Sequence, residues 1–148
     1  MVRTFARLLA ILLLSACAAP SPAPKGWHPI AGETGAWSMG SGARLQEYRV
    51  TNAPFSGGLQ DLASQVTIDV LTRHRGARWE GSAPFASCPG PAGIARFRLP
   101  DERRLEEAFS VRNGRAVRIA YVHPLGTSGD PAALEAMKNS LCRLSANQ

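Results

Sequence analysis

The sequence predicts an α+β fold in which two helices pack on an antiparallel sheet of about four to six strands. Three observations predict it. First, three segments with alternating apolar and polar residues follow one another between residues 94 and 121. Second, a segment with helical spacing lies on either side of these three. Third, the sequence shows no internal repeat. Strands joined by short turns pair antiparallel, so the three segments should form a meander.

The chain begins with the layout of a secretory signal peptide, in which Arg3 and Arg7 precede an uncharged apolar run over residues 8–14. That run is far shorter than the roughly 20 residues that span a bilayer. The sequence Leu14-Ser15-Ala16-Cys17 resembles the lipobox of bacterial lipoproteins. The resemblance implies cleavage of residues 1–16 as a type II signal peptide, lipidation of the Cys17 thiol and acylation of the new amino terminus. An uncleaved anchor, or a signal cut at Ala16 or Ala18, is the alternative.

Residues 17–26 form the next unit, a spacer with Pro20, Pro22 and Pro24 at alternate positions. Proline fixes φ and removes a hydrogen-bond donor, so the spacer should be extended and reach up to about 28 Å. Residues 27–148 then form a single globular domain, long enough to bury a core.

The expected cleavage before Cys17 also bears on the net charge of the mature chain and on its location in the cell. Arg3 and Arg7 leave with the signal peptide, which lowers the net charge from +6 to +4. This mild excess favours an anionic partner such as lipid, or another envelope protein, and not nucleic acid. An aspartate directly after the lipidated cysteine would resemble an inner-membrane retention signal. This chain has Ala18 and Ala19 there instead. We therefore expect a periplasm-facing protein that its lipid holds in the outer membrane.

The two remaining cysteines, Cys88 and Cys142, are an even pair in an oxidising compartment, and we expect a disulfide between them. Closing a loop of this length contributes roughly 4 kcal/mol in the chain-entropy model. The alternative is a free nucleophilic or metal-binding thiol, for which the chain offers no Cys-x-x-Cys spacing.

The domain opens with two expected strands, over residues 37–39 and 44–50, ended by Asn52-Ala53-Pro54. Trp27 and Trp37 are expected to be core or lid aromatics. A helix of about four turns follows from Leu59, with Ser56 as its cap and Gly76 as its stop. Three consecutive β-branched residues, Val66-Thr67-Ile68, leave a strand as the alternative for its second half.

The meander comprises residues 94–99, 105–111 and 117–121. A two-residue turn at Asn113-Gly114 would set Phe109 opposite Arg118 and place the two apolar rows on different faces. We therefore predict a three-residue loop that sets Phe109 opposite Val117 and Leu105 opposite Tyr121, so that both rows share one face.

The last helix should begin at Asp130-Pro131, an N-cap residue followed by proline. Its core stripe is expected to comprise Leu134, Met137, Leu141 and Leu144. This order of elements is similar in layout to the Mog1/PsbP-like class over roughly residues 37–144, which implies a fold and no function.

No constellation of catalytic residues, metal ligands or cofactor-binding motifs emerges. His28, His74 and His123 are isolated, and Gly126-Thr127-Ser128-Gly129-Asp130 misses the spacing of a nucleophile elbow. We therefore expect a non-enzymatic binding or assembly module of the envelope with no cofactor. The alternative is a small hydrolase or thiol-dependent enzyme whose site gathers His123, Ser128 or an unpaired Cys88.

The candidate binding residues are Arg73, Arg75, Arg78 and Trp79. Arginine pairs with phosphate or carboxylate, and an indole suits a membrane interface, so these residues could contact an anion or a lipid. The alternative is a helix end followed by a core tryptophan, since cations favour the negative end of a helix dipole.

Overall fold

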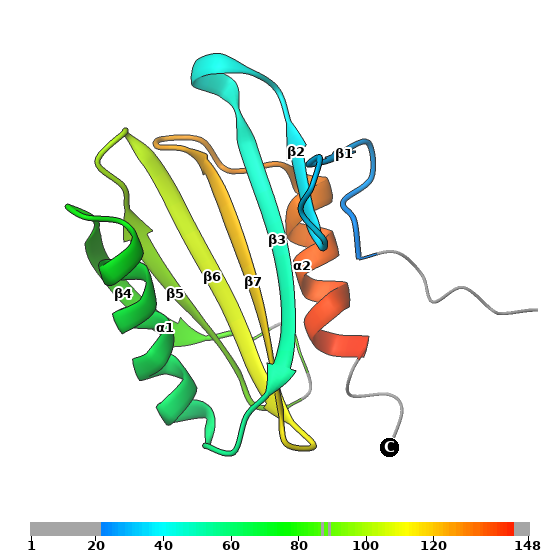
Figure 1. Ribbon diagram of the computed structural model, residues 1–148, viewed down its shortest axis with the longest axis vertical. Coiled ribbons are helices and arrows are strands. Elements are labelled where there is room, and N and C mark those ends of the chain that lie inside the picture. Colours follow the sequence, from blue (N-terminus) through cyan, green and yellow to red (C-terminus); the bar gives the residue numbers. More distant parts are fainter. Residues whose placement is uncertain (1–21, 87, 89, 144–148) are drawn as a thin grey trace, which may run out of the picture.

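The computed structural model describes residues 22–143 except 87 and 89, and it shows one seven-stranded antiparallel sheet with a long helix on each face (Figure 1). The strand order is β1-β2-β3-β7-β6-β5-β4. The elements are β1 (His28–Pro29), β2 (Ala36–Met39), the 3-10 helix η1 (Gly42–Arg44), β3 (Gln46–Pro54), α1 (Leu59–Arg73), β4 (Arg78–Pro84), β5 (Ala92–Arg98), β6 (Arg103–Arg112), β7 (Arg115–Pro124) and α2 (Pro131–Arg143). The predicted α+β class is confirmed, with more strands than expected because β1 and β4 add one at each edge.

Each face of the sheet has its own core. One core joins α1 to the sheet through Leu62, Val66 and Val70, which pack with residues of β5, β6 and β7. The other core joins α2 to the sheet through Ala133, Met137 and Leu141. The sheet therefore buries residues on both faces, which explains why β5 is buried almost throughout.

The predicted loop between β6 and β7 is wrong. Arg112 pairs with Arg115 and Phe109 with Arg118, so the turn contains only Asn113 and Gly114. Both have positive φ, 48° and 68°, as a type I′ turn requires. The prediction assumed a single buried face. With a helix on each face, apolar rows on opposite faces are both used.

Helix α1 begins at Leu59 as predicted and persists through its β-branched residues, but its predicted cap and stop are wrong. The N-cap is Gly58, not Ser56, and the Asp61 carboxylate accepts a hydrogen bond from the Gly58 N–H at 2.8 Å. The helix ends at Arg73, three residues before Gly76. Gly76, with φ of 85°, serves the turn into β4 instead.

Helix α2 begins where Asp130-Pro131 predicted, and the Leu134 N–H donates to the Asp130 carbonyl. Its predicted stripe is partly wrong. Leu134 is 38% exposed, and Ala133 takes its place in the core beside Met137 and Leu141. Leu144, the last member of that stripe, lies outside the described residues.

Two early strands confirm the expected order with shifted bounds, since β2 begins at Ala36 and β3 continues from Gln46 to Pro54. Strand β4 was not predicted from the sequence. Its residues are exposed almost throughout, so they carry no alternation of apolar side chains. Within residues 22–143, no helix is long and apolar enough to cross a membrane.

Candidate functional site

The predicted arginines gather where α1 ends and β4 begins. The Ala77 N–H donates to the His74 carbonyl at 2.9 Å, which reverses the chain after the helix. Gly76 packs closely against Pro100, because a Cβ at this position would meet the proline Cγ at 3.2 Å. This turn brings the last turn of α1 and the start of β4 to one edge of the molecule (Figure 1). We call this region the α1-end surface and define it by Ile68, Leu71, Arg73, Arg75, Arg78 and Trp79.

The three arginines of the α1-end surface have no carboxylate partner among the described residues. Elsewhere in the described part, six arginines form ion pairs, namely Arg49, Arg96, Arg98, Arg103, Arg104 and Arg118. Arg73 donates from Nε to the Asp69 carbonyl at 3.3 Å, as a cation near a helix C-terminus does. Arg75 and Arg78 lie beyond the helix, so their charge remains available to a ligand.

Three large apolar side chains of the same segment, between residues 68 and 79, are also exposed. Trp79 is 54% exposed, and its Nε1 donates to the Ser82 hydroxyl at 3.3 Å. The alternative that Trp79 is a core tryptophan is therefore wrong. Ile68 and Leu71 are 65% and 41% exposed. Sequence reasoning did not single out these two residues, although their positions outside the core stripe of α1 were a usable signal.

The carboxylates near the α1-end surface are all engaged elsewhere. Asp61 caps the start of α1, and Asp69 pairs with Arg118 at 2.6 Å. Glu80 pairs with Arg104 at 3.2 Å. The local field of this surface is consequently positive, which favours anionic ligands.

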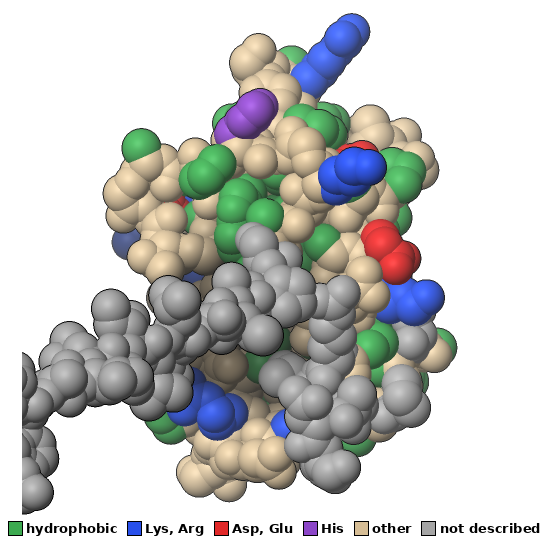
Figure 2. Space-filling model, turned by 90° about the vertical axis from the view of Figure 1, so that its right-hand side faces the viewer, with side chains coloured by type: hydrophobic (Ala, Val, Ile, Leu, Met, Phe, Trp, Pro, Cys, Tyr) green, Lys and Arg blue, Asp and Glu red, His purple; other side chains and the backbone are tan. Residues whose placement is uncertain are grey.

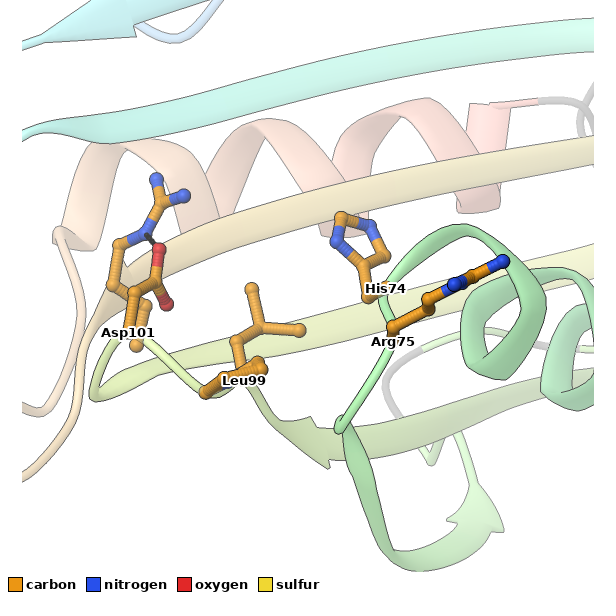
Figure 3. Close-up of a pocket in the computed structure, with 6 residues that line it drawn as sticks. His74, Arg75, Leu99 and Asp101 are labelled. Carbon is orange, nitrogen blue, oxygen red and sulfur yellow. Dashed lines mark hydrogen bonds and ion pairs between the residues drawn. The ribbon is translucent and has the colours of Figure 1, made fainter.

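A pocket of about 190 Å³ opens next to the α1-end surface. It is lined by His74, Arg75, Leu99, Pro100, Asp101 and Arg103. Figure 3 shows Asp101 on one side, His74 and Arg75 on the other, and Leu99 between them. Arg103 is already paired with Asp101 at 2.7 Å and with Glu47 at 3.1 Å. Arg75 is thus the lining residue whose charge is free.

The imidazole of His74 contributes polarity but little charge to this pocket. Burial lowers the pKa of His74 below its ordinary value of 6.5, and the nearby Arg73 and Arg103 lower it further. Asp101 and Glu107 oppose this effect only in part. His74 is therefore neutral at pH 7 and can donate or accept a hydrogen bond.

A second polar cluster lies at the start of α2 and is part of the packing. The Tyr121 hydroxyl donates to Gln46 Oε1 and accepts from the Asp130 N–H at 2.6 Å, and burial raises the pKa of Tyr121 to about 12. The Asp130 carboxylate also accepts from Trp27 Nε1 at 2.7 Å, which holds the first residues of the domain against α2.

His123 belongs to the same cluster. Its ring stacks on Tyr121 at 4.8 Å, and its Nδ1 lies 3.0 Å from the Thr127 hydroxyl and 3.2 Å from the Pro124 carbonyl. Ser128, which the enzyme alternative placed with His123, is not among its hydrogen-bond partners in the described part of the chain. Burial lowers the pKa of His123, and Glu106 opposes the shift in part.

The sulfur atoms of Cys88 and Cys142 lie at bonding distance, as the predicted disulfide requires, and their Cα atoms are 5.0 Å apart. The end of α2 is thereby joined to the segment between β4 and β5. Cys17, the predicted lipidation site, lies outside the described residues. Among the residues described, no three His, Cys, Asp or Glu side chains gather as metal ligands would.

The opposite edge of the sheet differs from the α1-end surface. Figure 2 faces this edge, where β1 and β2 lie, and shows Lys and Arg side chains scattered singly among polar and hydrophobic ones. The N-terminal residues of the described chain leave the domain on this side (Figure 1).

Comparison with known proteins identifies a fold and no family. No family model matches the sequence, and no curated protein matches it. The structure is similar to that of PA94, a Pseudomonas aeruginosa protein of unknown function, with a TM-score of 0.50 and 12% identity over 82% of this chain and 87% of that one. It is also similar to CyanoP, the PsbP protein of Synechocystis sp. PCC 6803, with a TM-score of 0.47 and 12% identity over 69% of this chain and 72% of that one. The similar structures include a PsbP-like protein, and at 12% identity the likeness to PA94 bears on the fold alone.

Proposed function

We propose that the protein is a lipid-anchored component of the bacterial envelope that acts as a non-enzymatic binding or assembly module, with the α1-end surface as its binding surface. One observation carries the proposal. Among the described residues, Arg73, Arg75 and Arg78 have no carboxylate partner, and the same segment exposes three large apolar side chains, in a domain that pairs many of its other arginines.

The residue types of the α1-end surface are suited to binding. Exposed apolar side chains that adjoin one another mark interaction sites more often than scattered ones do. Guanidinium groups recognise phosphate or carboxylate with directional hydrogen bonds. A tether at Cys17 would raise the concentration of any membrane-associated partner near the domain, so weak contacts would suffice for binding.

The anchor is tested by the mass of the N-terminal peptide of protein purified from native membranes. The proposal expects a chain that begins at Cys17 and carries three acyl chains, and it expects Cys17→Ser to leave the membrane fraction. An unmodified peptide that begins at Met1 would contradict the anchor.

The binding surface is tested by placing a photo-cross-linking residue at position 75 of the full chain in cells. Position 44 is the matched control, because Arg44 is also exposed and forms no ion pair within the described residues. Adducts are expected at position 75 and should disappear when Arg73 and Arg78 are both changed to Gln. Adducts at position 44 alone would contradict the assignment of the surface.

A further inference from the structure

We propose that β4 is an interface at which two copies of this chain pair edge to edge and join their sheets. The contact lies at the free edge of the sheet and does not depend on the lipid anchor. It goes beyond the proposed function, because it names a second copy of the chain as a partner.

The two edges of the sheet differ in what they expose. Strand β1 is two residues long, whereas β4 comprises seven residues that are exposed almost throughout. Among the described strands β4 is the last in the order, and Figure 1 shows it as the outermost strand on the side away from α2. An edge strand carries N–H and carbonyl groups that another strand can bond. Of the two edges, β4 is therefore the one long enough to accept a further strand.

The alternation of hydrogen bonds identifies backbone groups of β4 that point outwards. The Leu99 N–H donates to the Arg103 carbonyl at 2.8 Å, so Leu99 and, two residues earlier, Phe97 direct their backbone groups to β6. Phe97 lies opposite Trp79, whose N–H and carbonyl must then point away from β5. By the same alternation, the backbone groups of Ser82 also point outwards.

The side chains around Trp79 complement a second copy of themselves. Trp79 is 54% exposed and lies on the face that α1 covers, since its cross-strand neighbour belongs to the core beneath α1. Arg78, opposite Arg98, lies on the other face. Glu80 lies there too, because it pairs at 3.2 Å with Arg104, which is opposite Arg98 in β6. The Glu80 carboxylate can accept from a second guanidinium as well.

Two-fold symmetry and charge select the register. In a symmetric antiparallel pair the residue at the axis lies opposite itself, and outward-pointing groups can bond across an axis at Trp79 or at Ser82. An axis at Trp79 sets Arg78 of each copy opposite Glu80 of the other and brings the two indoles together on one face. An axis at Ser82 sets Glu80 opposite Pro84 instead. Charge complementarity therefore places the axis at Trp79.

Features that blunt an edge strand keep this contact short. A bulge between Trp79 and Gly81 interrupts the strand, and Pro84 has no N–H to donate. Pairing is thereby confined to the first part of β4. Because a two-fold contact occupies the edge of both copies, we expect a weak dimer and no longer assembly.

The experiment uses the full chain with Trp79→Cys, in the cells that make it, oxidised with copper phenanthroline. An axis at Trp79 brings the two Cα atoms of position 79 to about 5.5 Å, which a disulfide can bridge. A disulfide-linked dimer is therefore expected on a non-reducing gel. The unsubstituted chain, treated in the same way, shows what the native cysteines contribute.

Two matched controls show whether the link is specific. Ser82→Cys lies in the same exposed strand, but with the axis at Trp79 the two copies of position 82 are about 20 Å apart and should not link. Arg44→Cys, also exposed, reports random collisions. Both should give far less dimer than Trp79→Cys.

Charge reversal shows that the contact is between chains. In the Trp79→Cys background, Arg78→Glu and Glu80→Arg each set like charges opposite one another, and each alone should lower the yield of dimer about tenfold. When the two variants are co-expressed with different tags, they should link to each other at the yield of Trp79→Cys alone, because the mixed pair has opposite charges at both contacts. Loss of the ion pair between Glu80 and Arg104 within one chain cannot produce this rescue.

Three results would overturn the inference. They are the absence of a linked dimer of Trp79→Cys, equal linking of Ser82→Cys or Arg44→Cys, and a mixture of the charge variants that links no better than either variant alone. The proposed function is tested separately by adducts at position 75. An adduct of Trp79→Cys with a different protein, in place of the dimer, would contradict this inference and leave the proposed function standing.

Discussion

Glu107 is a buried charged residue, and its burial would be costly without a positively charged partner. Its carboxylate is buried on the α1 face of the sheet, where Arg118 donates from Nε to Oε1 at 2.5 Å. The same guanidinium donates from Nη1 to Asp69 on α1 at 2.6 Å. A buried carboxylate is tolerated only when it is paired, so Arg118 holds this charge and links β6, β7 and α1.

Replacing Arg118 should therefore be costly. Arg118→Met leaves Glu107 buried without its cation, and we expect a loss of about 3–5 kcal/mol in the free energy of unfolding. Asp69→Asn should cost less than about 1 kcal/mol, since the Asp69 side chain is 37% exposed and screened by water. Urea unfolding of both variants provides the measurement. Equal losses would show that the charge on α1, and not the buried carboxylate, dominates the cluster.

His123 gives stability a dependence on pH. Burial lowers its pKa in the folded state below 6.5, so between these two pKa values the unfolded chain binds more protons. The free energy of unfolding should be highest above pH 6.5 and should fall as the pH drops through 6.5 towards the folded-state pKa, by at most about 1.4 kcal/mol per pH unit for this one group.

Urea unfolding between pH 5 and pH 8 measures this slope. His123→Gln should flatten part of it, and His74→Gln another part, because the pKa of His74 is also lowered. A slope unaffected by His123→Gln would contradict the buried, neutral imidazole.

At the scale of elements, a local sequence pattern predicted an element correctly where interactions within one helical turn determine the backbone geometry. Asp130-Pro131 predicted the start of α2, because capping and the proline φ act within one turn. The β6–β7 register could not be derived in this way. Whether Phe109 should face Arg118 or Val117 depends on how many faces of the sheet are covered, and this follows from where both helices pack.

The bridge between Cys88 and Cys142 should stabilise α2 in particular. Its 54-residue separation corresponds to about 4 kcal/mol of loop entropy. Cys142→Ser should lose up to that amount in urea unfolding, and hydrogen exchange should rise first in α2, whose end is then no longer joined to the sheet segment. Reductant should reproduce the loss in the native chain and leave Cys142→Ser unchanged. A loss of less than about 1 kcal/mol would show that packing alone holds the helix.

At the scale of the whole molecule, the sequence predicted the charges of the α1-end surface but not its extent. Arg73, Arg75 and Arg78 stand out because they are close together in the chain. Ile68 and Leu71 were not singled out, although both lie outside the core stripe of α1 and this spacing indicates that they face away from the sheet. The position of this surface opposite the β1 edge depends on the strand order, which no local pattern encodes.

If the protein binds through the α1-end surface as proposed, that surface is occupied when the protein is at its membrane. Hydrogen exchange compared between native membranes and detergent-extracted protein tests this claim most directly. We predict slower exchange on membranes over residues 68–80, where the exposed apolar and basic side chains lie, and unchanged exchange over α2. Protection confined to α2 and β1, with residues 68–80 exchanging equally in both states, would contradict it.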